Sequence, residues 1–244
     1  MCGRFVSSSP PDQIAAYFDA ALGESLVEHP LAPNYNTAPT NDVYAVVETP
    51  EGRRVEVFHW GLIPVWAKDM KLGQKMINAR AETVASKGAF KPAFKRKRCI
   101  IPADGFYEWQ KRPGQKTKQP YFIHRLDGEP LAFAGLWETW RDPNAGPDAP
   151  WLQSCTIITT TANETMEPIH DRMPVILPPK AWGPWLDRAN EDLVELNGLL
   201  VPAPKELLTL RPVSTEVNNV RNKGEDLVAE VEPDDPDAGQ TELL

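Results

Sequence analysis

The amino-acid sequence predicts an α+β fold with largely antiparallel β-sheets, and two observations carry that prediction. First, β-rich runs at Val43–Glu48 and Arg53–Trp60 flank Thr49-Pro50-Glu51-Gly52, which is the pattern of a hairpin. Second, the other β-rich runs also lie close together in the sequence instead of alternating with long helices, as a parallel sheet would require. No internal repeat is present, so we expect one domain.

The remaining elements follow from apolar spacing and turn residues. Further strands are expected at Arg98–Trp109, Tyr121–Arg125, Leu131–Trp137, Leu152–Thr161 and Val175–Leu177. A helix should begin after Ser9-Pro10-Pro11, because the apolar residues from Ile14 to Leu22 recur at helical spacing. Tryptophans and leucines between residues 182 and 200 indicate two more helices.

The composition is typical of a globular protein that buries a full core. The 244 residues are 41% hydrophobic and 25% charged, and no apolar run approaches the roughly 20 residues that span a bilayer. The N-terminus lacks a basic and then apolar signal pattern, so we expect an intracellular, cytoplasmic protein. Three cysteines are too few for a disulfide framework, and neither they nor the histidines show the spacing of metal ligands. We therefore expect neither membrane attachment nor a bound metal.

Negative charge is concentrated at the C-terminal end. The net charge is −8, and eight acidic residues without a basic one follow from Glu225 to the end of the chain. The body is therefore neutral, and we assign residues 2–222 to the domain and residues 223–244 to a flexible acidic tail. Within the body, basic residues gather between Lys91 and Arg98, which is either ordinary solvated surface or part of a basic groove.

The most informative residue is Cys2, which directly follows the initiator methionine. Removal of Met1 would leave Cys2 with a free α-amine and a thiol on adjacent carbons, and both groups are nucleophilic near neutral pH. Such a 1,2-aminothiol captures an aldehyde twice, first as a Schiff base through nitrogen and then as a thiazolidine through sulfur. From position alone, an ordinary residue in a frayed terminus is the commoner case, so the reactive interpretation needs support from other residues.

Three polar residues elsewhere are candidates for acid–base or positioning roles. Asn78 would share a helical face with Glu82 if a helix starts here, although it could equally be a simple N-cap. Glu108 alternates with aromatic residues in a β-rich run, and partial burial there would raise its pKa toward neutrality. His170 lies beside Asp171 in a loop bounded by prolines, where catalytic side chains are often displayed. A strand glutamate exposed to solvent and a structural or solvent-facing loop histidine are the alternatives.

These residues occur within longer motifs. The motifs are Cys2-Gly3-Arg4-Phe5, Tyr35-Asn36-Thr37-Ala38-Pro39-Thr40, Trp60-Gly61-Leu62-Ile63-Pro64, Asn78-Ala79-Arg80-Ala81-Glu82, Cys99 to Trp109, Phe133-Ala134-Gly135-Leu136-Trp137 and His170-Asp171-Arg172-Met173-Pro174. In this order they resemble the SOS response-associated peptidase (SRAP) family, the abasic-site-processing proteins, over residues 2–222. The resemblance implies a single SRAP-type domain whose largely antiparallel sheets form a barrel-like core flanked by helices.

The resemblance also implies a function. Members of the family form a covalent thiazolidine with the aldehyde of an abasic site in single-stranded DNA, which shields the lesion from strand cleavage. When the roles of the family's residues are assigned to the matching motifs, Cys2 is the nucleophile, and its active-site partners are Asn78, Glu108 and His170. Self-removal of Met1 by a cysteine-type peptidase activity is a further implication, although an ordinary methionine aminopeptidase would also accept a small second residue. Because a Schiff base promotes β-elimination, a weak lyase activity is expected as well.

The same motifs supply candidate DNA contacts. Arg4, Arg80 and Arg172 are expected at phosphates, and Trp66 in an apolar loop is expected to stack on a base. The full set of expected DNA-binding residues is Arg4, Asn36, Pro39, Trp66, Arg80, Thr159 and Arg172. The expected partner is single-stranded DNA that contains an abasic site, bound by a monomer without any cofactor. The cytoplasmic protein would then associate with the nucleoid when it is bound to DNA.

Two other classes of function remain open from the residues. An N-terminal-nucleophile amidohydrolase or peptidase would use the same Cys2 on small amides and would form no covalent DNA adduct. A non-catalytic single-strand-binding module would keep the aromatic residues and the arginines, and would lose nothing when Cys2 is replaced by alanine.

Overall fold

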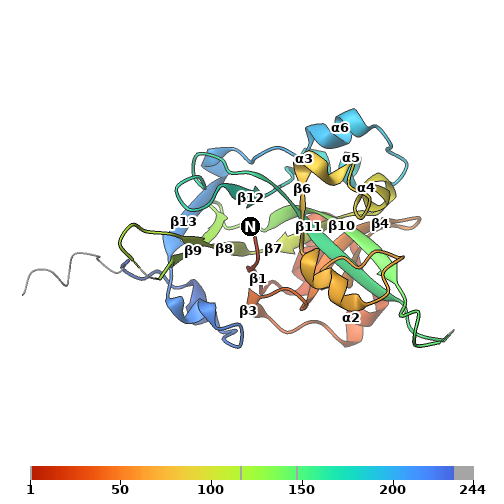
Figure 1. The fold of residues 1–244 in the computed structure, drawn as a ribbon, viewed down its shortest axis with the longest axis horizontal. Coiled ribbons are helices and arrows are strands. Elements are labelled where there is room, and N and C mark those ends of the chain that lie inside the picture. The colour runs from red at the N-terminus through yellow and green to blue at the C-terminus, as the bar shows by residue number, and fades with distance from the viewer. Residues whose placement is uncertain (1, 116, 147, 234–244) are drawn as a thin grey trace, which may run out of the picture.

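Strands that form a barrel and a second sheet, with short helices outside them, make up the structure (Figure 1). The computed structural model describes residues 2–115, 117–146 and 148–233. Its strands are β1 (Phe5–Ser7), β2 (Ala21–Leu22), β3 (Asn34–Thr37), β4 (Asp42–Thr49), β5 (Gly52–Trp60), β6 (Asn78–Arg80), β7 (Arg98–Ala103), β8 (Gly105–Gln110), β9 (Gln119–Arg125), β10 (Leu131–Trp140), β11 (Leu152–Thr161), β12 (Arg172–Pro174) and β13 (Leu208–Pro212). Its α-helices are α1 (Pro11–Phe18), α2 (Glu24–Glu28), α3 (Ala81–Val84), α4 (Lys91–Arg96), α5 (Pro179–Leu186) and α6 (Leu193–Gly198), and its 3₁₀-helices are η1 (Met70–Lys75), η2 (Lys205–Leu207), η3 (Thr215–Asn218) and η4 (Glu225–Val228).

Five strands close into a ring. β4 and β5 form the expected hairpin, with Val46 opposite Val55. β5 then pairs in parallel with β11, and β11 pairs antiparallel with β10. β10 pairs antiparallel with β7, which returns to β4 where Ile100 lies opposite Val46. The predicted α+β fold, with largely antiparallel sheets and a barrel-like core, is confirmed.

A second sheet, ordered β13-β9-β8-β1-β3, extends from the barrel (Figure 1). The single strand expected at Arg98–Trp109 divides at Asp104, so that β7 belongs to the barrel and β8 to this sheet. The Asp104 carboxylate accepts hydrogen bonds from the backbone N–H groups of Ser8 and Ser9 at 2.7 and 3.0 Å. These bonds hold the chain that follows β1 against the corner between β7 and β8.

Aromatic rings join β1 to the barrel. Phe5 on β1 packs edge-on against Trp60 and Phe133, with ring centroids 5.1 and 6.1 Å apart. Phe106 on β8 packs against the same Phe133 at 5.9 Å. All four rings are fully buried, and each removes a large apolar area from water. The start of the chain is therefore part of the core.

The helix prediction at Asn78 is wrong because strand pairing prevails over the local helix signal. Asn78 does not begin a helix, since Asn78–Arg80 is strand β6 and pairs in parallel with β11. The N-cap of α3 is Arg80, so the alternative interpretation of Asn78 as an N-cap is also wrong. The short strand expected at Val175–Leu177 is shifted to Arg172–Pro174, although Ile176 within the expected range forms an isolated β-bridge with Phe133. The helices expected after Pro10 and near the C-terminal end are present as α1, α5 and α6.

Residues 223–233, which the sequence assigns to the flexible tail, pack on the second sheet. Leu227 on η4 is buried in a cluster with Tyr107 and Val213. Val213 also forms an isolated β-bridge with Glu230. Acidic composition predicted disorder here, but a buried leucine and backbone pairing hold the segment in place. The remainder of the expected tail, residues 234–244, lies outside the described residues.

Arg98, at the end of the basic run that begins at Lys91, serves the fold. Arg98 is buried, and its guanidinium donates to five backbone carbonyl groups. These acceptors are the carbonyl oxygens of Phe94, Lys95, Trp185, Asp187 and Asn190. Arg98 thereby ties α4 and the end of α5 to β7. Its neighbour Arg96 is exposed and pairs only with Glu191 among the described residues.

Replacing Arg98 should therefore be costly, whereas replacing Arg96 should not. Arg98→Ala leaves several buried carbonyl groups without a donor and opens a cavity, so we expect a loss of about 3 kcal/mol or more in the free energy of unfolding. Arg96→Ala removes a solvent-screened pair and should leave that free energy unchanged within error. Urea unfolding of both variants measures the difference, and equal effects would show that Arg98 is not a structural anchor.

Candidate active site at the amino terminus

Cys2 lies three residues before the start of β1, inside the molecule. The backbone N–H of Tyr107 on β8 donates to the carbonyl of Arg4 at 3.0 Å, and Phe5 lies opposite Phe106. This antiparallel pairing carries the chain inward, so that the side chain of Cys2 is fully buried. A frayed terminus is therefore excluded for residue 2.

Burial sets the protonation of the Cys2 thiol. Desolvation raises the pKa of the thiol far above its ordinary value, and the nearby Glu108 carboxylate raises it further. A hydrogen bond from the backbone N–H of Arg4 opposes the rise only in part. The sulfur is consequently a neutral thiol at neutral pH, and it needs a base before it can act as a nucleophile.

Asn78 approaches Cys2 from β6. Its Nδ2 donates a hydrogen bond to the carbonyl oxygen of Cys2 at 2.8 Å. Its Oδ1 is buried and has no hydrogen-bond partner within the described part of the chain. Buried polar atoms are nearly always paired, so this oxygen is an acceptor available to a ligand. Because β6 is fixed by pairing with β11, the amide is held in place from behind.

Glu108 is brought to the same site by β8. Its side chain is almost completely buried, and desolvation raises the pKa of the carboxyl, while the electrostatic interaction with His170 lowers it in part. The burial and raised pKa expected from the sequence are confirmed, and an exposed strand glutamate is excluded. A carboxyl in this setting is suited to acid–base chemistry.

His170 lies in the loop between β11 and β12 and acts electrostatically on Glu108. Its Nδ1 accepts a hydrogen bond from the backbone N–H of Arg172 at 3.0 Å and lies 2.8 Å from a carboxylate oxygen of Asp171. The Asp171 side chain is 87% exposed, so water screens that charge, and the backbone contact is the one that orients the ring.

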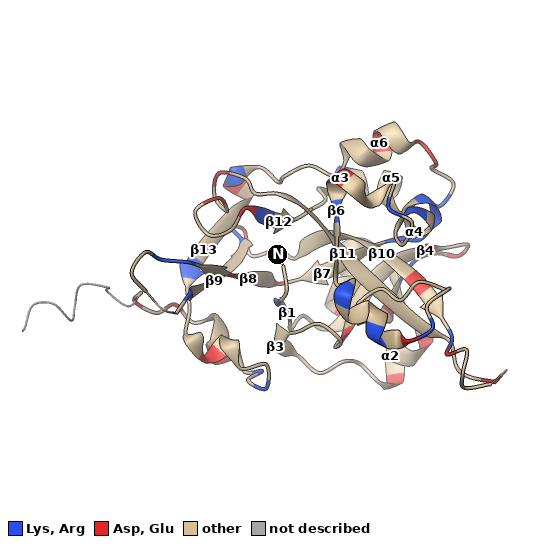
Figure 2. Cartoon of the chain, viewed as in Figure 1, with Lys and Arg blue, Asp and Glu red and all other residues tan. Residues whose placement is uncertain are grey.

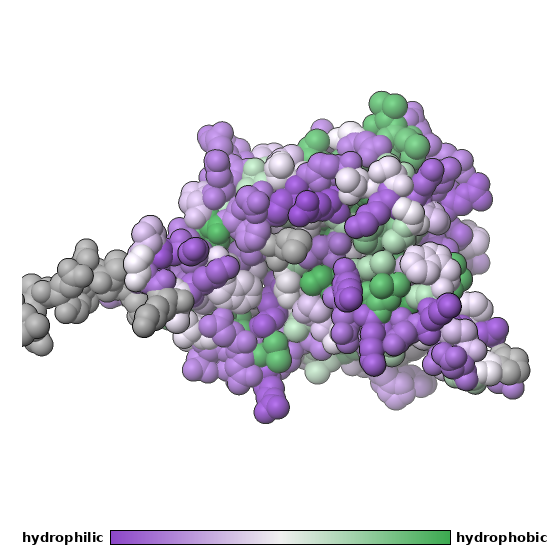
Figure 3. Space-filling model, viewed as in Figure 1, coloured by the Kyte–Doolittle hydropathy of each residue, from purple (hydrophilic) through white to green (hydrophobic). Residues whose placement is uncertain are grey.

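Three of the seven expected DNA contacts reach the surface of the protein. Arg80 on β6 is exposed, Trp66 is 60% exposed, and Pro39 is partly exposed. Figure 2 shows blue positions on β6 and β12 close to the start of β1. Figure 3 shows that the same face is largely hydrophilic, with scattered apolar patches. The face is therefore suited to a charged ligand.

The other four expected contacts are engaged within the protein. Asn36 and Thr159 are completely buried, so we reassign their side chains from DNA contact to support of the site. Arg172 forms an ion pair with Glu82, lowers the pKa of that carboxyl, and also donates to the carbonyl of Thr159 at 2.7 Å. Arg4 is partly buried, and one of its guanidinium nitrogens donates to Asn36.

Sequence reasoning missed the lysines around Trp66. We call residues 64–75 the lysine lobe, because Lys68, Lys71 and Lys75 lie on it beside Trp66. The lobe is rigidly attached: Trp140 donates through its indole N–H to the carbonyl of Ala67 at 2.7 Å. The spacing of the lysines after an exposed tryptophan is the sequence signal that could have found them.

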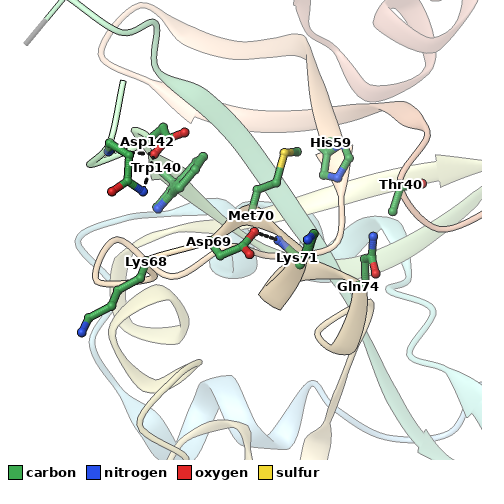
Figure 4. Close-up of a pocket in the computed structure, with 10 residues that line it drawn as sticks. Thr40, His59, Lys68, Asp69, Met70, Lys71, Gln74, Trp140 and Asp142 are labelled. Atoms are coloured by element: carbon green, nitrogen blue, oxygen red, sulfur yellow. Dashed lines mark hydrogen bonds between the residues drawn. The ribbon is translucent and has the colours of Figure 1, made fainter. Parts of the chain in front are cut away.

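A hollow of about 580 Å³ adjoins the lysine lobe. Figure 4 shows Met70 directed toward His59, with Thr40 and Gln74 at one side and Trp140 at the other. Thr40 follows Pro39, and its positive φ of 71° is unusual for a β-branched residue. The hollow thus connects the loop at residues 39–40 to the lysine lobe.

The fold and this site together define a class: an α+β protein that buries Cys2 close to an amide and a carboxyl, with an imidazole acting on that carboxyl. The chain belongs to the SOS response associated peptidase (SRAP) family, whose model matches residues 1–220.

Curated relatives agree with that assignment. Abasic site processing protein YoqW of Bacillus subtilis (strain 168) is 44% identical over 93% of this chain and 99% of its own length. YedK of Escherichia coli (strain K12), also named an abasic site processing protein, is 34% identical over 95% of this chain and 100% of its own. HMCES of Xenopus tropicalis carries the same description and is 33% identical over 95% of this chain and 78% of its own.

Solved structures share the fold. A crystal structure of a protein from Bacteroides thetaiotaomicron superimposes with a TM-score of 0.84 at 24% identity, over 95% of this chain and 100% of that chain. A Bordetella bronchiseptica protein gives a TM-score of 0.71 at 28% identity, over 87% of this chain and 100% of that chain.

Among the described residues, no helix has the length and apolar character needed to cross a membrane, and no group of three or more His, Cys, Asp or Glu side chains could hold a metal ion.

The pH dependence of stability tests the burial of Glu108. Because its pKa in the folded protein is raised above the ordinary value of 4.5, the folded state binds this proton more tightly than the unfolded chain does. Glu108 should therefore make the free energy of unfolding fall as pH rises from the ordinary pKa through the raised pKa. Urea unfolding of the wild type and of Glu108→Gln, which cannot titrate, measures this contribution. A difference between the two proteins that stays constant with pH would contradict it.

Proposed function

We propose that this protein processes abasic sites in single-stranded DNA by forming a thiazolidine between the lesion and Cys2, once Met1 has been removed. The observation that carries the proposal is the placement of Cys2. Its carbonyl accepts a hydrogen bond from Asn78, and the Glu108 carboxylate acts electrostatically on its thiol. The names of the three relatives, each an abasic site processing protein, support the same substrate.

The proposed reaction joins one aldehyde carbon to two atoms of Cys2. The α-amine adds to the aldehyde carbon, and the carbinolamine loses its hydroxyl group as water to give an iminium ion. The thiol sulfur then adds to the same carbon as its proton leaves, which closes a five-membered ring. One N–H hydrogen, one S–H hydrogen and the carbonyl oxygen leave as a single water molecule, so the step balances without an oxidant.

Proton transfer is assigned to Glu108 and His170. Since the thiol is neutral, sulfur attack needs a base, and loss of water from the carbinolamine needs an acid. A carboxyl with a raised pKa keeps a larger protonated fraction near neutral pH, so Glu108 can donate that proton and later recover it. Either residue can open the closed hemiacetal form in which an abasic sugar is mostly found.

Asn78 is assigned a positioning role. Its Nδ2 is already used by the carbonyl of Cys2, and its Oδ1 remains to accept a hydrogen bond from the α-amine or from a sugar hydroxyl. An amide can donate and accept hydrogen bonds without adding charge, so it would not disturb the protonation of the amine.

Single-stranded DNA is the proposed form of the substrate. The lesion must reach a cysteine inside the protein, and unpairing costs least where no partner base exists. Arg80 and the lysine lobe would contact phosphates, and Trp66 would stack on an unpaired base. We propose that a monomer carries out this reaction in the cytoplasm, where it associates with the nucleoid through its DNA.

Two further activities follow from the same chemistry. Met1 must leave before the amine is free, and we propose that Cys2 and its neighbours hydrolyse the Met1–Cys2 bond themselves, as the peptidase in the family description suggests. The Schiff-base intermediate acidifies the neighbouring carbon of the sugar and permits β-elimination of the 3′ phosphate, so a weak lyase activity is expected.

Replacement of Cys2 tests the function directly. On a denaturing gel, processed wild-type protein should form a heat-stable adduct with single-stranded DNA that contains one abasic site, and none with intact DNA. Cys2→Ala should abolish the adduct, whereas Cys155→Ala, a control at another buried cysteine, should retain it. An unreactive wild type that nevertheless cleaves small amides would favour the amidohydrolase, and undiminished crosslinking by Cys2→Ala would exclude the mechanism.

The role of Glu108 predicts a kinetic defect. Glu108→Gln cannot move a proton, so adduct formation at neutral pH should slow by about 10²-fold or more, a typical contribution of general acid–base catalysis. Release of the adduct should slow as well, because reopening the ring requires reprotonation of its sulfur or nitrogen. Single-turnover gels measure both rates, with Glu164→Gln, an exposed residue, as the control. Unchanged formation and release would remove Glu108 from the mechanism.

A further inference from the structure

The chain beyond the family match contributes a lysine close to Arg4. The family model ends at residue 220, yet Lys223 donates through Nζ to the carbonyl of Asn36 at 2.7 Å and to Oδ1 of Asn41 at 3.3 Å. The backbone carbonyl of Lys223 in turn accepts from the N–H of Tyr35 at 3.2 Å. Lys223 is therefore fixed to the segment that leads from β3 to β4.

Asn36 is the centre of this arrangement. Its buried Nδ2 donates to the carbonyls of Val217, Asn219 and Asn222 at 3.0 to 3.1 Å, which holds the whole turn that precedes Lys223. Its Oδ1 accepts from Nη1 of Arg4 at 2.8 Å. One buried side chain thus holds Arg4 on one side and the lysine-bearing turn on the other.

Two positive charges are consequently close together and partly removed from water. Desolvation lowers the pKa of Lys223, and the neighbouring Arg4 lowers it further. Desolvation also lowers the pKa of Arg4. None of the ion pairs between described residues involves either group. Holding two cations together in this way is unfavourable unless an anion compensates them.

The donor geometry leaves room for an anion. Nη1 of Arg4 is occupied by Asn36 and by the carbonyl of Val217, but no acceptor within the described chain bonds to Nη2 or Nε. The guanidinium also lies over the ring of Trp109, with 5.7 Å from its central carbon to the ring centroid, which fixes its plane. Lys223 uses two of its three N–H groups on protein oxygens and keeps the third.

We propose that Arg4 and Lys223 together bind one phosphate of the DNA strand, next to the abasic sugar held at Cys2. The proposal rests on the proposed function for the identity of the anion, and it adds Lys223 as a DNA-binding residue. Arg4 is two residues from Cys2, so a phosphate bound here flanks the captured sugar. A planar guanidinium supplies directed hydrogen bonds to phosphate oxygens, and the ammonium supplies a point charge.

A nonreactive DNA separates this proposal from the covalent chemistry. Single-stranded DNA with a tetrahydrofuran abasic analogue carries no aldehyde, so affinity can be measured as a function of salt with processed protein. Lys223→Gln should weaken binding and reduce the slope of log affinity against log salt by about 0.7, the value for one phosphate contact to a single strand. Lys223→Arg should restore the slope. Lys91→Gln, at an exposed residue of α4, is the control that keeps it.

Neutral methylphosphonate linkages locate the phosphate. Placed at one of the two positions that flank the analogue, such a linkage should remove most of the difference in affinity between wild type and Lys223→Gln. A linkage several nucleotides away should leave the difference intact. An unchanged salt slope in Lys223→Gln, or equal losses at every linkage position, would overturn the proposal. If aldehyde-containing DNA gave no adduct with wild type while these results held, the phosphate site would stand and the crosslinking function would fall.

Discussion

The antiparallel pairing of β1 with β8 is the interaction on which the candidate site depends. It holds Phe5 opposite Phe106, and both rings pack against Phe133 in the barrel. A chain terminus usually frays because few contacts hold it. Here Phe5, the third residue after Cys2, belongs to the core. The contacts that stabilise the domain therefore also hold Cys2 in position. Loss of this pairing would damage the fold and the site together.

The burial that positions Cys2 also makes the site chemically unusual. The pKa values of the Cys2 thiol and the Glu108 carboxyl both rise through desolvation, and Oδ1 of Asn78 is left without a partner among the described residues. At neutral pH the buried carboxyl and the unpaired amide oxygen both reduce stability, which is typical of a site that is arranged for a ligand. The surrounding aromatic cluster and the anchor at Arg98 supply the stability that offsets them.

The features of the fold and the site that could be predicted from the sequence are those that depend on local residue patterns and on longer motifs. The hairpin of β4 and β5 was predictable from its turn residues, and the burial of Glu108 from its alternation with aromatic residues. Asn78 was misplaced in a helix because its strand exists only through pairing with β11, which is distant in the sequence. Lys223 was assigned to a tail because its acidic surroundings say nothing of the hydrogen bonds it makes to Asn36 and Asn41.

The central claim is that Cys2 captures an aldehyde through both nitrogen and sulfur, and intact mass spectrometry of the adduct tests it most directly. The account predicts a mass equal to protein plus abasic DNA minus one water molecule, attached at residue 2, and unchanged by borohydride because a closed ring contains no reducible C=N bond. An adduct that gains two hydrogens on borohydride treatment would be an open Schiff base. That result, or attachment at a lysine, would contradict the account.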